Sequence, residues 1–105
     1  MNLKSTKLIG LILLTAVGCG QPSNTKLLER GSYAMYQGRW SDAAENYEQA
    51  IKQHPGDWEA QYNLGRCLLE LGDPKRASQS LAVAESLRPY NNEIADTYAE
   101  SLIVS

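Results

Sequence analysis

The chain of 105 residues is poor in the side chains that most often carry chemistry. It has one histidine, two cysteines and no phenylalanine. This leaves too few soft ligands for a structural zinc site, and two cysteines cannot form the several bridges of a disulfide-rich miniprotein. Basic residues are not in excess either, since ten Lys and Arg stand against twelve Asp and Glu. The net charge of −2 has the wrong sign for neutralising phosphates, so we expect no nucleic-acid partner.

Catalytic motifs are also missing. The sequence has no nucleophile and base at a motif spacing, no paired acids, no metal-ligand cluster and no phosphate-binding loop. The single histidine, His54, directly precedes Pro55 and is best explained as an exposed loop residue. We therefore expect a non-enzymatic protein with no catalytic residues, no metal and no cofactor, formed as one small domain whose core comes from packing alone.

The only long apolar run lies at the N-terminus. Lys4 and Lys7 precede about ten mostly apolar residues over 8–17, too few to span a bilayer, which needs about 20. Such a run is typical of a secretory signal. It ends in Ala-Val-Gly-Cys, and this ending resembles the lipobox of bacterial lipoproteins.

The lipobox resemblance implies a signal peptide over 1–18, acylation of Cys19, and a polar tether over 19–24. The attached lipid would anchor the chain in the cell envelope. Gly20, rather than Asp, after the cysteine implies the outer membrane, facing the periplasm. Two alternatives stay open: ordinary cleavage would release a soluble periplasmic protein, and an uncleaved segment would be a short retained anchor.

Beyond the tether the sequence repeats with a period of 34 residues. Six pairs recur at this spacing: Gly31 and Gly65, Gly38 and Gly72, Ala43 and Ala77, Ala50 and Ala84, Pro55 and Pro89, Asp57 and Asn91. The period and the residue types resemble the tetratricopeptide repeat (TPR), a helix-turn-helix unit. The resemblance implies one repeat over 24–57, a second over 58–91, and a closing helix over 92–104.

The repeated residues predict where the helices end and begin. Gly38 and Gly72 fall where the first helix of each repeat stops, because glycine accepts the left-handed backbone that closes a helix. Asp73 is the expected N-cap of the next helix, with Pro74 at its first position. In the first copy we expect Ser41 to be the cap.

Two other pairs shape the hairpins. Gly31 and Gly65 allow the first helix of a repeat to approach the second closely, and Pro55 and Pro89 stop the second helices. Apolar residues recur at steps of three and four, as in amphipathic helices, and no segment alternates like a strand. We therefore predict an all-α fold, a short right-handed α-solenoid over 25–105 with two hairpins and a closing helix.

The two ends of this stack depart from the repeat pattern. The opening helix has Arg30 and Ala34 where the pattern has large apolar residues. We therefore expect either marginal stability or an outer flank covered by a partner, a second copy or the membrane. In the closing helix the pattern places four residues at core positions: Ala95, Tyr98, Ala99 and Leu102.

The TPR resemblance further implies a concave groove that holds a peptide or a helix of a partner protein, lined by the first helices. The residues expected to line it are Leu28, Ser32, Met35, Tyr36, Glu59, Tyr62, Asn63, Arg66, Leu69, Glu70 and Asp96. We expect apolar anchoring at Met35, Tyr36, Tyr62 and Leu69, and a basic ligand group toward Asp96 and Glu100. These positions could instead be ordinary core and solvated surface.

The sequence thus favours a lipid-anchored adaptor of the cell envelope that binds a protein partner, for example in a secretion, pilus or outer-membrane assembly system. The alternative is a structural module that associates with its own copies. Cys67 is expected to be buried and inert, or else to pair between molecules. Trp40 and Trp58 are expected to serve packing.

Overall fold

The computed structural model describes residues 21–104. The expected signal peptide and Cys19 lie outside the described residues, as does Ser105. Regular structure within 21–104 consists of five helices and no strand: α2 (Asn24–Tyr36), α3 (Trp40–Gln53), α4 (Trp58–Glu70), α5 (Pro74–Leu87) and α6 (Asn92–Val104). The predicted all-α fold is confirmed. No helix in this part of the chain has the length and apolar character needed to cross a bilayer.

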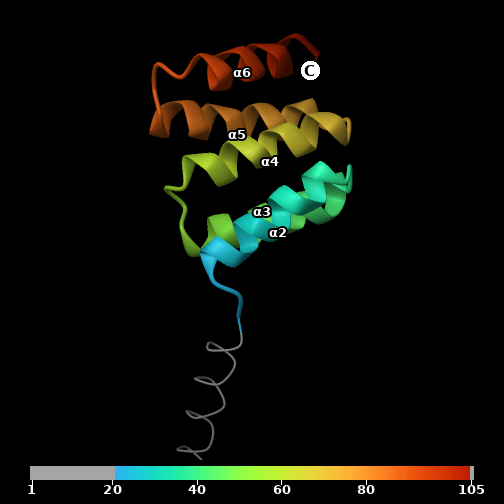
Figure 1. The fold of residues 1–105 in the computed structure, drawn as a ribbon. Helices are drawn as coiled ribbons and strands as arrows, with labels where there is room; N and C mark the ends of the chain where they lie inside the picture. The colour runs from blue at the N-terminus through green and yellow to red at the C-terminus, as the bar shows by residue number, and fades with distance from the viewer. Residues whose placement is uncertain (1–20, 105) are drawn as a thin grey trace, which may run out of the picture.

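The helices form a stack in chain order. Helices α2 and α3 form one hairpin, α4 and α5 form a second, and α6 lies on α5 at the end opposite α2 and α3 (Figure 1). Each helix packs mainly against its neighbours in the sequence, and α3 and α4 join the two hairpins. The expected arrangement of two hairpins and a closing helix is therefore present.

Glycine turns end the first helix of each hairpin, as predicted. Gly38 has a φ of 75° and Gly72 a φ of 79°, the left-handed region that a residue with a Cβ rarely adopts. Each turn is closed by a backbone hydrogen bond of 2.8 Å, from Arg39 N to the Ala34 carbonyl and from Asp73 N to the Leu68 carbonyl. These bonds satisfy carbonyls that the helix end would otherwise leave unpaired.

The caps of the second helices differ between the hairpins. Asp73 caps α5 as predicted, because its Oδ1 accepts from the Arg76 N–H at 3.2 Å. The predicted cap at Ser41 is wrong. The N-cap of α3 is Arg39, two residues before Ser41, so Ser41 lies inside the first turn of the helix, and no side chain makes a capping hydrogen bond there. An ion pair of 3.0 Å between Arg39 and Asp42 ties this end together instead.

The two hairpins are built around the predicted close approaches. A Cβ added at Gly31 would lie 2.7 Å from Cζ of Tyr47, and one added at Gly65 would lie 2.5 Å from Cγ of Leu81. Both distances are too short for real contacts. Tyr47 and Leu81 are fully buried, so each fills the space that its glycine leaves.

The inward face of α6 differs from the prediction. Ile94 and Ser101 are buried against the stack, and Tyr98 is half-buried. The other three expected core positions are exposed: Ala95, Ala99 and Leu102. In α4 the equivalent positions lie on the side that packs against α5, the second helix of its hairpin. No such helix follows α6 within residues 21–104, which is the physical reason for the difference.

Candidate functional site

A hollow lies between α2 and α4, over the start of α3. Its volume is about 260 Å³ and its lining comes from all three helices: Ser32, Met35, Tyr36, Trp40, Tyr47, Asn63 and Arg66. Five of these residues, those of α2 and α4, were predicted to line the groove. Trp40 and Tyr47, which belong to α3, were not among the residues expected there.

Tyr47 reaches the hollow because of Gly31. Its ring packs across the glycine, and its hydroxyl lies beside that of Ser32, where the two oxygens are 3.2 Å apart and share a hydrogen bond. Burial raises the pKa of Tyr47, so the phenol stays protonated and can donate as well as accept. The second copy has Leu81 at this position. The sequence could have indicated the role of Tyr47 in the hollow, because it has a hydroxyl-bearing residue opposite a glycine where the second copy has an apolar one.

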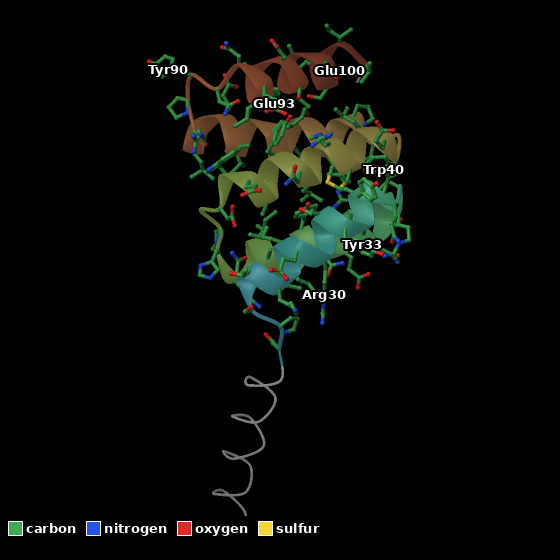
Figure 2. The ribbon with its side chains drawn as sticks, viewed as in Figure 1. Arg30, Tyr33, Trp40, Tyr90, Glu93 and Glu100 are labelled. Carbon is green, nitrogen blue, oxygen red and sulfur yellow. The ribbon has the colours of Figure 1, made fainter. Side chains whose placement is uncertain are left out.

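Apolar surface lies at the rim of the hollow. Tyr36 is 88% exposed, whereas Met35 and Trp40 are half-buried and pack against the core. Trp40, labelled in Figure 2, is the first residue of α3, directly after the turn. It lines the hollow together with Met35. A ligand side chain entering here would contact a thioether and two aromatic rings.

Arg66 supplies the positive charge of the hollow. Its guanidinium carbon lies 5.7 Å from the centre of the Tyr62 ring. None of the ion pairs found among residues 21–104 includes Arg66. The hollow therefore combines an apolar rim, two hydroxyls, the Asn63 amide and one cation that has no ion pair within the described chain.

Tyr62 does not offer the accessible ring that the sequence suggested. Only 6% of its surface is exposed, and its hydroxyl lies 3.4 Å from the Thr97 hydroxyl of α6. Burial is the main cause of the raised pKa of Tyr62. The Tyr62 hydroxyl thus joins α4 to α6, and the buried ring offers little surface to a ligand.

A second hollow of about 460 Å³ lies between the C-terminal ends of α4 and α6. It is lined by Leu69, Glu70, Gly72, Pro74, Glu100 and Val104. Leu69 and Glu70 were predicted for the groove, and with Glu100 they make this end apolar and acidic. The remaining predicted residues line neither hollow: Leu28 is half-buried, and Glu59 and Asp96 are exposed.

The other candidate groups lie apart from these hollows. Cys67 is a free, buried thiol whose pKa burial raises to about 11. Within the described residues no group of three or more His, Cys, Asp or Glu gathers to hold a metal ion. The candidate lipidation site, Cys19, lies outside the described residues.

Comparison with known families returns a match. The family model described as tetratricopeptide repeat matches residues 28–92, which run from the second turn of α2 to the first residue of α6. No curated protein matches the chain. The matched range includes every residue that lines the hollow between α2 and α4.

Proposed function

Since the chain belongs to the tetratricopeptide repeat family, we propose that it is a non-enzymatic module that binds a segment of a partner protein along α2, α4 and α6. The observation that carries this proposal is the hollow between α2 and α4, where the guanidinium of Arg66, in no ion pair of the described chain, lies beside an apolar rim. Arginine, tryptophan and tyrosine are the residue types that most often dominate binding energy at protein interfaces.

The composition of the hollow defines the ligand. An apolar or aromatic side chain would pack against Met35, Tyr36 and Trp40, and a carboxylate next to it would pair with Arg66. The acidic C-terminal half of the groove, with Asp96 and Glu100, would take a basic group further along the ligand. We therefore propose a segment with an acidic residue beside an apolar one, followed by a basic residue.

Crosslinking from Tyr36 tests this proposal, because its ring is exposed at the rim. A photoreactive residue at position 36 should capture a partner in intact cells, whereas one at Gln49, exposed on α3, should not. The captured segment is then synthesised and titrated against the purified protein. Arg66→Ala should weaken binding about 10- to 100-fold, the usual effect of losing a charge-assisted hydrogen bond.

Arg88→Ala is the matched control for that titration. Arg88 lies over the Trp58 ring at 4.6 Å and lines neither hollow, so its loss should leave the affinity unchanged. Equal capture from positions 36 and 49, or an Arg66→Ala protein that binds as tightly as the parent, would overturn the proposal.

We further propose that Cys19 carries the lipid that anchors this module in the bacterial cell envelope, as a small component of a secretion, pilus or outer-membrane assembly system. The support is the lipobox-like ending of the apolar run and the polar tether behind it. Metabolic labelling with an alkyne fatty acid should mark the parent and not Cys19→Ser, which should also leave the membrane fraction. Unlabelled parent protein in the soluble periplasmic fraction would instead favour ordinary cleavage.

A further inference from the structure

The segment in front of α2 is held against the first hairpin. The side-chain amide of Gln53, the last residue of α3, donates to the Pro22 carbonyl at 2.8 Å. Ser23 caps α2, because its Oγ accepts from the Lys26 N–H at 3.3 Å. Residues 22 and 23 are therefore fixed at the end of the hairpin where α2 begins and α3 ends (Figure 1).

A polar hollow of about 350 Å³ lies beside this segment. The described residues that line it are Gln21, Pro22, Gln49, Lys52 and Gln53. Their side chains supply amide N–H groups and one ammonium group, and none of them is a carboxylate. The hollow therefore combines the positive charge and the hydrogen-bond donors that bind a phosphate group.

The acids of α3 do not neutralise the ammonium group of Lys52. None of the ion pairs found among residues 21–104 includes Lys52. Glu48, one turn before Lys52 on the helix, pairs with Arg76 at 2.9 Å. Glu45 lines a different hollow, together with Arg30. The charge of Lys52 is thus available to a ligand from outside the described chain.

The length of chain between the hollow and Cys19 indicates what this ligand is. Cys19 is two residues before Gln21, so at most about 7 Å of extended chain separates them. The headgroup layer of a bilayer is itself about 5–8 Å deep on each side. A lipid on Cys19 would therefore keep the hollow at the level of the phospholipid headgroups.

We propose that the hollow binds the headgroup of a phospholipid in the anchoring bilayer, with the phosphate held by Lys52 and the neighbouring amides. This inference rests on the proposed lipidation of Cys19 and adds a second, non-covalent contact with the membrane. It is separate from the groove, because no residue lines both this hollow and the one between α2 and α4.

Headgroup crosslinking in vesicles tests the proposal. The full-length protein is purified from the membrane fraction with its lipid and reconstituted into vesicles of phosphatidylethanolamine and phosphatidylglycerol, in which some of the phosphatidylethanolamine carries a photoreactive headgroup. Crosslinks mapped by mass spectrometry should concentrate at residues 49–54. Lys52→Ala should lower them at least several-fold. Lys75→Ala, which removes an exposed lysine of α5 outside the hollow, is the matched control and should leave them unchanged.

Inorganic phosphate distinguishes the lipid from a free anion. An excess of phosphate, compared with chloride at the same ionic strength, should not reduce the crosslinks, because the anchor keeps the headgroups at a high effective concentration. Loss of the crosslinks in phosphate alone would show a site for the free anion and would overturn the proposal.

Three further outcomes would overturn the inference. With lipid present on Cys19, crosslinks spread evenly over the chain, or unchanged in Lys52→Ala, would refute this site alone. A protein captured by a photoreactive residue at position 49 would show that the hollow faces a protein. Absence of a fatty acid on Cys19 would remove the anchor and this site together, and would leave the groove function standing.

Discussion

At the scale of single residues, Gly65 controls how closely the second hairpin packs. We predict that Gly65→Ala destabilises the protein by about 1–3 kcal/mol, because the added Cβ would lie 2.5 Å from Cγ of the fully buried Leu81. This clash outweighs the helix propensity of alanine, which favours the variant by about 1 kcal/mol. Gly56→Ala is the control, since nothing lies within 4 Å of a Cβ there. Urea unfolding measures both, and a Gly65→Ala protein as stable as the parent would contradict the packing.

Cys67 should make stability fall at alkaline pH. Burial raises the pKa of its thiol to about 11, so the folded state keeps a proton that the unfolded chain loses near pH 9. The free energy of unfolding should therefore be highest below pH 9 and decrease as the pH rises toward 11. Tyr47, whose pKa burial also raises, should add to the loss above pH 10.

Thiol chemistry checks the same residue directly. Iodoacetamide at pH 8 should label Cys67 only after unfolding, and Cys67→Ala should flatten the fall in stability between pH 9 and 11. Rapid labelling of the folded protein at pH 8 would show that the thiol is not buried.

The residues of the hollow between α2 and α4 could be predicted only in part from the sequence. The recurrence of glycine at positions 31 and 65 predicts that the two helices of each hairpin pack closely, because a residue without a Cβ leaves room for the facing helix. This recurrence does not predict that the ring of Tyr47 crosses Gly31 and delivers a hydroxyl to Ser32, since that depends on the side-chain direction across the hairpin. For the same reason the sequence assigns Trp40 to packing, although this residue also lines the hollow.

At the scale of helices, the two hairpins should respond differently to removal of their expected caps. We predict that Asp73→Ala destabilises the protein by about 1 kcal/mol, because Asp73 accepts a hydrogen bond from the Arg76 N–H at the start of α5. Ser41→Ala, at the cap expected for α3, should have little effect, since no side chain makes a capping hydrogen bond at the start of α3. Thermal unfolding of both variants measures the difference, and a large loss in Ser41→Ala would show that the cap assignment is wrong.

Most helix ends follow from the sequence, and the packed face of α6 does not. Gly38 and Gly72 mark turns because their backbone is left-handed. Pro55 and Pro89 follow the ends of α3 and α5, since proline cannot continue a helix. These are local effects. Which side of α6 is buried depends instead on the presence of a neighbouring helix. The pattern of complete repeats predicted that Ala99 is buried against a following helix, but residues 21–104 contain no such helix and Ala99 is exposed.

At the scale of the whole molecule, packing is uneven along the stack. Helix α4 contacts α3 on one side and α5 on the other, whereas α6 packs on α5 and touches α4 only slightly. An array of this kind is stabilised by contacts between neighbours, and its end units open first. Within residues 21–104, α2 and α6 are the two end helices, so a partner or second copy that covered either one would add to the stability.

Hydrogen exchange should reveal this gradient. In dilute protein we predict that amides of α4 exchange slowest and those of α6 fastest among the five helices. Ile94→Ala should speed exchange in α6 further, because this residue is 1% exposed and its truncation removes about 2–5 kcal/mol of packing. Ile103→Ala, on the 82% exposed side, is the matched control and should leave the dilute protein unchanged. Protection of α6 equal to that of α4 in dilute protein would contradict the gradient.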